Sequence, residues 1–170
     1  GKKRFNTDLF GLGKKKYKQF VLRHSGNDHN NTRFKDAFLT SIISEEGMDV
    51  QQSTPTHLFI NSEYWGVYNI REKINDHYIK NNYNIESDGL EILQGLKTAE
   101  FGSNKNYNEL RDYIRKNNLK DSLHYKHILE HVDIRNFINY WIFQMFIVNH
   151  DARGNIRFWS SSLLDNKYRW

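Results

Sequence analysis

The chain has 170 residues, of which 38% are hydrophobic and 15% aromatic, a composition typical of a globular domain rather than a disordered chain. It contains no cysteine, which excludes disulfides and thiolate metal sites. No apolar run is long enough to span a bilayer, so we expect no membrane span.

The net charge is +5, and its positive excess lies at the start of the chain. Residues 1–23 hold one acidic residue, Asp8, and eight basic ones: Lys2, Lys3, Arg4, Lys14, Lys15, Lys16, Lys18 and Arg23. Such a segment can attract nucleic acid, anionic lipid or an acidic peptide, but a solvated, solubilising segment is commoner. The chain opens without Met, so we expect a processed or partial chain.

The first half of the sequence predicts mainly strands. Residues 17–23 alternate as a strand does, and a polar loop follows. Thr32 is the expected cap of a helix that runs to about Glu46, where Gly47 closes it. Residues 56–70 predict a β-hairpin turning at 61–63, and residues 72–80 a short helix.

The second half predicts mainly helices. One begins near Asn104, a second covers Leu123–His131, and Asp133 caps a third that carries an apolar stripe. We expect this third helix to be the central, buried one. Residues 155–160 and 167–170 predict two strands, whereas residues 86–105 give no clear pattern.

The order of these elements predicts an α+β fold in two parts. A strand-rich part, residues 1–85, precedes a helical part, residues 104–170, that ends in a loop and hairpin. Two-lobed nucleotide phosphotransferases are organised this way: the nucleotide lies between the lobes, and a loop after a buried helix supplies catalytic groups.

The segment FIVNHDARGNIRFW, residues 146–159, is the candidate for that loop. Phosphoryl transfer needs a carboxylate to orient the attacking hydroxyl and oxygen ligands for magnesium. Asp151 and Asn155 have the right types at nearly the right spacing. The alternative is a turn in which both side chains bond to local backbone, and spacing alone favours that alternative.

Other candidates are weaker. Arg23 ends a strand and can supply the cation that grips phosphate, although a solvated or salt-bridged arginine is commoner. The hairpin YWGVYNIRE can line an adenine site with the backbone from Tyr68 to Ile70. His127 and His131 are one helical turn apart, as in zinc sites, but no Glu follows His127 directly, so we interpret the pair as a surface feature.

Three segments together resemble the CotH-type kinases, a family named for a bacterial spore coat protein. VLRHSGNDHNNTRFKDAF is similar to the family's strand, Gly-Asn-Asp loop and Arg-containing helix. HLFINSEYWGVYNIREKI is similar to its N-G-E-Y-W-G-x-Y-N-x-x-E hairpin, the most specific block. DIRNFINYWIFQMFIVNHDARGNIRFW is similar to its D-x-x-N-F-I-x-Y helix and the N-x-D loop that follows.

The resemblance implies a two-lobed atypical protein kinase-like fold that transfers phosphate from ATP to Ser or Thr with Mg²⁺. It implies Asp151 as the catalytic-loop carboxylate and Asn155 as the metal-coordinating amide. Arg23 is then the phosphate cation, with Asp36 or Glu72 as its acidic partner. Members are often exported, which favours a bacterial cell surface or spore coat, and the partner is a protein with a Ser/Thr-rich segment.

The sequence departs from the family pattern at the loop. Asn155 is followed by Ile156 rather than by a second Asn, the loop is one residue shorter, and Ala152 replaces a frequent aromatic. The family's second metal-binding acid lies beyond a segment like KYRW, where this chain stops. We therefore expect a C-terminally truncated domain with weak nucleotide binding and little activity of its own, unless Asp165 substitutes for the missing acid.

Two alternatives remain open. The same fold with a degenerate site would be a binding module of a surface or coat assembly, and the shorter loop favours it. A nucleic-acid-binding or cleaving domain would fit the basic start and the Asn-His-Asp sequence before a hairpin. Cleavage would require a second His on a following helix, and none follows His150. We therefore do not expect nucleic acid as the partner.

Overall fold

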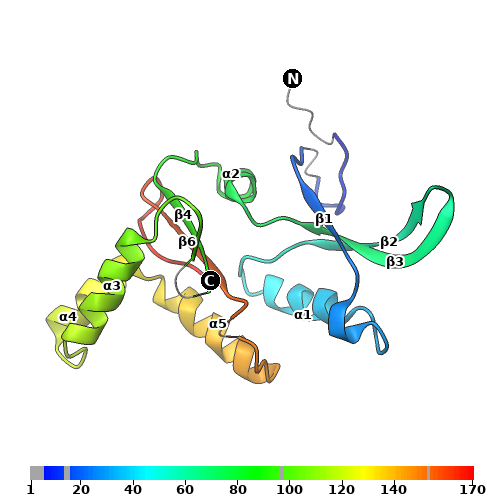
Figure 1. The fold of residues 1–170 in the computed structure, drawn as a ribbon. Helices are drawn as coiled ribbons and strands as arrows, with labels where there is room; N and C mark the ends of the chain where they lie inside the picture. The colour runs from blue at the N-terminus through cyan, green and yellow to red at the C-terminus, as the bar shows by residue number, and fades with distance from the viewer. Residues whose placement is uncertain (1–5, 14–15, 96–97, 153) are drawn as a thin grey trace. The chain divides into compact units, whose positions relative to one another are not determined.

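The computed structural model describes residues 6–13, 16–95, 98–152 and 154–170 of the chain. It divides into two compact units, Gly1–Tyr78 and Ile79–Trp170. Within the described residues there are five α-helices and two three-stranded antiparallel sheets, so the fold is mixed α and β (Figure 1). Several basic residues of the start lie outside the described residues: Lys2, Lys3, Arg4, Lys14 and Lys15.

The sheet of the first unit has the order β1-β3-β2. Strand β1 is Phe20–Arg23, β2 is Ser53–Ile60 and β3 is Glu63–Glu72. The predicted hairpin is confirmed, because β2 and β3 pair antiparallel across a turn at Asn61 and Ser62. Both turn residues have positive φ, 51° and 67°, which is the backbone of a tight two-residue hairpin turn.

Helix α1, Lys35–Ser44, begins later than the sequence predicted, and Thr32 does not cap it. The cap position is Phe34, whose side chain makes no capping bond. Asp28, the last residue of the short 3-10 helix η1 (Gly26–Asp28), caps α1 instead. Its carboxylate accepts the Lys35 N–H at 3.0 Å. Asp28 also accepts hydrogen bonds from the backbone and hydroxyl of Thr32, which lower the pKa of its carboxyl.

Helix α2, Asp76–Tyr83, also begins later than predicted. The Asn75 side chain accepts the N–H groups of His77 and Tyr78, both at 3.1 Å, and so caps the first turn. The chain passes from the first unit to the second within this helix.

The sheet of the second unit has the order β5-β4-β6. Strand β4 is Leu90–Gln94, β5 is Thr98–Phe101 and β6 is Arg157–Ser161. The middle strand, β4, lies within residues 86–105, for which the sequence gave no clear pattern. Leu90, Ile92 and Leu93 are almost completely buried, so both faces of β4 are covered and its residues do not alternate between apolar and polar.

Three helices belong to this unit: α3 (Lys105–Lys116), α4 (Ser122–His131) and α5 (Ile134–Phe146). Asp133 caps α5 as predicted, since its carboxylate accepts the Asn136 N–H at 3.1 Å. The core of the unit combines the middle of the sheet with α3 and α4, and its buried members are Leu93, Leu110, Ile128, Val132, Ile156, Phe158 and Tyr168.

The prediction that α5 is the central buried helix is wrong. None of its residues is buried, and Ile142, Met145 and Phe146 have exposed fractions of 55%, 68% and 74%. Only one side of its first half packs on the core, through Ile134 and Phe137 among others. Helix α5 does carry the predicted apolar stripe, but β4 and β6, rather than α5, form the centre of the core of this unit.

The predicted strand at residues 167–170 is reduced to isolated bridges. Tyr168 pairs with Val132, and Arg169 pairs with Trp159. The Tyr168 N–H donates to the His131 carbonyl at 2.9 Å, and the Asp133 N–H donates to the Tyr168 carbonyl at 3.1 Å. These bonds fasten the final residues to the junction of α4 and α5. None of the helices described is long and apolar enough to cross a membrane.

Candidate functional site

The loop between α5 and β6 is anchored to the helix through Asn149. The helix ends where Val148 takes a positive φ of 53°. The Asn149 amide then donates to Gln144 Oε1 at 2.6 Å, and its oxygen accepts the Asp151 N–H at 3.1 Å. The backbone entering Asp151 therefore has a fixed position relative to the last turn of α5.

Asp151 and Asn155 lie side by side in this loop. Asn155 Nδ2 donates to Asp151 Oδ2 at 2.5 Å, and both side chains are exposed. Their neighbours Ala152 and Ile156 are buried, which directs the two polar side chains outward. The bond joins two side chains, whereas the turn considered as an alternative would join them to backbone. Arg153 lies outside the described residues.

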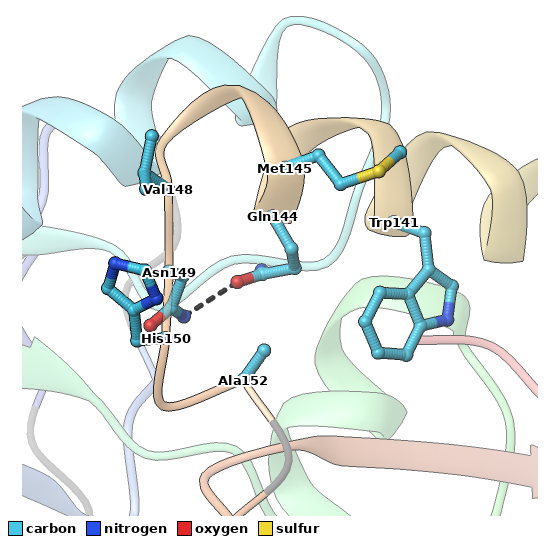
Figure 2. Close-up of a pocket in the computed structure, with 7 residues that line it drawn as sticks. All are labelled: Trp141, Gln144, Met145, Val148, Asn149, His150 and Ala152. Carbon is cyan, nitrogen blue, oxygen red and sulfur yellow. Dashed lines mark hydrogen bonds between the residues drawn. The ribbon is translucent and has the colours of Figure 1, made fainter.

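A hollow of about 230 Å³ adjoins the loop (Figure 2). Its wall is mostly apolar. The residues that line it come from α5 and the loop: Trp141, Gln144, Met145, Val148, Asn149, His150 and Ala152. The exposed pair at 151 and 155 thus stands next to a space that can receive an apolar group.

In the first unit, Asp36 of α1 contacts two arginines. Its carboxylate lies 3.5 Å from the guanidinium of Arg23 and accepts a shorter hydrogen bond from Arg71. The Arg71 side chain is 5% exposed, whereas those of Arg23 and Asp36 are 56% and 59% exposed. The structure therefore brings together Arg23 and Asp36, and it adds Arg71, which the sequence reasoning missed.

Strand register explains why the two arginines share a face. Val21 pairs with Arg71, and Arg23 pairs with Asn69. Directly opposed residues of antiparallel strands point to the same side, and alternate residues along a strand share a side. Arg23 and Arg71 therefore project from one face of the sheet. The alternation of residues 69–72 (NIRE) was the sequence signal for the side on which Arg71 lies. Alternation alone does not say which residue of β1 pairs with Arg71.

The other candidates of β3 lie on the opposite face. Ile70 pairs with Leu22 and Glu72 pairs with Phe20, and Tyr68 shares their side by alternation. Glu72 is 4% exposed, and its backbone N–H donates to the Gln52 carbonyl at 2.9 Å. Of the two acids expected to accompany Arg23, Asp36 is the one on its face. The adenine-binding role of Tyr68 and Ile70 stays a prediction.

These candidates are divided between the units. Arg23 and Asp36 belong to the first unit, and Asp151 and Asn155 to the second. A cleft shared by both groups stays a prediction.

Asp165 lies in the turn that follows β6 and is held by Arg169. The Arg169 guanidinium donates to its carboxylate at 2.9 and 2.5 Å, and the Lys167 N–H donates at 3.1 Å. The bond from Arg169 lowers the pKa of the Asp165 carboxyl. A carboxylate engaged in this way is part of the turn.

A family model described as CotH kinase protein matches residues 1–170, which is the whole chain. The chain belongs to the CotH kinase family, as its three sequence blocks predicted, and membership supports a kinase-like function. No curated protein matches the chain.

Proposed function

We propose that the protein is an ATP-dependent protein kinase of the CotH type, which transfers a phosphoryl group to Ser or Thr with Asp151 as the catalytic-loop carboxylate. The observation that supports it most directly is the 2.5 Å hydrogen bond between Asp151 and Asn155 on an exposed loop. Family membership supplies the reaction class.

Asp151 has the chemistry for the proton step. As the substrate hydroxyl attacks phosphorus, its O–H bond breaks and the proton passes to the Asp151 carboxylate. The bond to the leaving nucleotide oxygen breaks as the new bond forms. The Asn149 side chain holds the Asp151 backbone, so the carboxylate starts from a defined position.

The loop also fits magnesium by its donor set. Asn155 and Asn149 offer amide oxygens, which are among the hard ligands that this ion prefers. When bound, Mg²⁺ supplies positive charge that neutralises the phosphates. Asn155 donates its nitrogen to Asp151, so it must rotate its amide to present oxygen.

Arg23 is the proposed phosphate cation, and Asp36 positions it. Arg71 is buried and bonds to Asp36, which leaves the exposed Arg23 as the arginine able to reach a ligand. In this proposal the backbone from Tyr68 to Ile70 contacts adenine.

The test measures phosphotransfer from ATP to a basic, Ser-rich peptide by the protein at its full natural length. Asp151→Asn should lower the rate by at least about 100-fold, because a positioned general base contributes that much or more. Asp112→Asn, an exposed acid of α3 that pairs with Arg115, serves as the control and should keep the rate. Equal rates for Asp151→Asn and the control would remove Asp151 from the mechanism.

The alternative within the same fold is a binding module of a surface or coat assembly with a degenerate site. The loop supports it, because it is one residue shorter than in the family pattern and so changes the spacing between its acid and its amide. A thermal shift on adding ATP and Mg²⁺ favours the kinase, and no shift favours the module. A location outside the cell or in a spore coat belongs to either proposal.

A further inference from the structure

Helix α4 carries a cluster of metal-binding side chains far in sequence from the catalytic loop. His127, Glu130 and His131 place one ligand atom each within 4.8 Å of one another. Their sequence order, His-x-x-Glu-His, is the reverse of the zinc-peptidase pattern. The Glu stands directly before His131 rather than directly after His127, so the segment does not match the His-Glu-x-x-His pattern.

We propose that these three side chains form a site for a transition-metal ion such as Zn²⁺. Positions i and i+4 of a helix lie on one face, so His127 and His131 can hold one ion between them. Glu130 is exposed and can complete three protein ligands, which leaves a fourth position for water.

The hydrogen bonding of His131 prepares it as a ligand. Its Nδ1 lies 2.9 Å from the His127 carbonyl oxygen, which can only accept a hydrogen bond. Nδ1 therefore carries the proton, and Nε2 keeps its lone pair for a metal. A bond from the second ring nitrogen to a backbone carbonyl is the usual support of a metal-binding histidine.

Ring packing limits the motion of His127. Its ring lies 4.1 Å from that of Tyr113 in α3 and 4.4 Å from that of His131, measured between centroids. Both histidines are half-buried, so little side-chain freedom is lost when an ion binds. Tetrahedral zinc needs ligand atoms roughly 3.3 Å apart, which small side-chain rotations would reach.

The ligand chemistry separates this site from the catalytic loop. Imidazole nitrogen suits Zn²⁺, whereas Mg²⁺ prefers oxygen ligands. The site lies where the end of α4 is joined to the segment around Tyr168, because the His131 carbonyl accepts the Tyr168 N–H. A metal on His131 would secure the end of α4 where the final residues of the chain attach.

The test is titration of the whole chain with Zn²⁺ by calorimetry. One ion should bind, and His127→Ala and His131→Ala should each weaken binding at least about tenfold. Glu130→Gln replaces an exposed side chain, so it tests the third ligand without risk to folding. His29→Ala removes an exposed histidine of the first unit and should leave the affinity unchanged.

A second measurement covers the case in which a histidine variant does not fold. In the unaltered chain, Zn²⁺ should shift the ring proton resonances of His127 and His131 before those of other histidines, and Mg²⁺ should shift neither. The proposal is overturned if the folded His127→Ala and His131→Ala variants bind Zn²⁺ as tightly as the parent. It also fails if other histidines shift first.

Discussion

Asn155 donates a hydrogen bond from Nδ2 to Asp151 Oδ2 at 2.5 Å, across a loop that ties α5 to β6. An acid and an amide four residues apart thus meet through their side chains. In the proposed kinase the Asn155 oxygen coordinates the magnesium ion, so the amide has a different role in the free and the bound protein.

Replacing Asn155 with Ala should raise the Mg²⁺ concentration needed for ATP binding by at least about tenfold, because one oxygen ligand is lost. The measurement is the ATP-dependent thermal shift as a function of Mg²⁺. Asn118→Ala is the control, since Asn118 accepts the Lys120 N–H in a turn between helices. An unchanged Mg²⁺ requirement in Asn155→Ala would exclude Asn155 as a ligand.

Asp36→Ala should destabilise the first unit by about 1.5–3 kcal/mol, because it leaves the buried guanidinium of Arg71 without its partner. Arg71 Nε is already buried without a hydrogen bond. The measurement is urea unfolding, with Glu46→Ala, an exposed acid of the same unit, as a control expected within about 0.5 kcal/mol of the parent.

A double variant tests the stated cause. Adding Arg71→Met to Asp36→Ala removes the stranded charge and should recover most of the lost free energy of unfolding. If the double variant is no more stable than Asp36→Ala, the burial of Arg71 is not the source of the loss.

Tyr168→Phe should cost about 1.5–3 kcal/mol at neutral pH. Tyr168 donates to Glu91 Oε2 at 2.5 Å, and Glu91 is only 6% exposed, so the change removes one of its two bonds. The other bond, from Asn106 at 2.8 Å, remains. Tyr125→Phe, at an exposed position of α4, should have little effect in the same unfolding assay.

Alkaline pH gives an independent measurement. Burial, followed by the bond to Glu91, raises the pKa of Tyr168 above its ordinary value of 10.0. A pKa raised in the folded state adds stability that is complete below pH 10 and is lost as the pH rises above it. The parent should therefore lose stability above pH 10 more steeply than Tyr168→Phe. Parallel curves for the two proteins would contradict this assignment.

Gly102→Ala should be strongly destabilising, since a Cβ there would lie 2.2 Å from the Leu90 carbonyl oxygen. Gly95 provides a matched control in the same unit. Both residues have positive φ, 71° and 60°, but a Cβ at Gly95 would meet only an ordinary contact at 3.7 Å. Both variants carry backbone strain, and Gly102→Ala should cost roughly 1–3 kcal/mol more by thermal unfolding. Equal losses of stability in the two variants would mean that the backbone of β4 can shift to make room for the added Cβ at position 102.

Local chemistry made several elements predictable. The hairpin at Asn61 and the cap at Asp133 depend on residues close together in sequence. Strand β4 was missed because a short apolar run fits a buried strand and a buried helix segment equally well. The exposure of α5 was not predicted, because periodicity reveals an apolar stripe on a helix but not whether other residues cover that stripe.

The candidate site likewise combines contacts between residues close in sequence, which could be predicted, with contacts between distant residues, which could not. Asp151 and Asn155 are four residues apart, and their meeting follows from one loop. The contact between Asp36 and Arg71 joins a helix to a strand 35 residues away. Sequence reasoning named Asp36 but not Arg71, because this contact depends on strand register and on where α1 lies.

Strand β4 has a consequence for how the second unit is made. Its partner β6 arrives late, since Leu90 pairs with Ser161 and three helices lie between the two strands in sequence. During synthesis on the ribosome, α3, α4 and α5 emerge while one side of β4 still lacks its neighbour. Such distant pairing is slow, and an open strand edge invites association with other chains. The nascent protein is therefore most vulnerable to aggregation in the interval before β6 emerges.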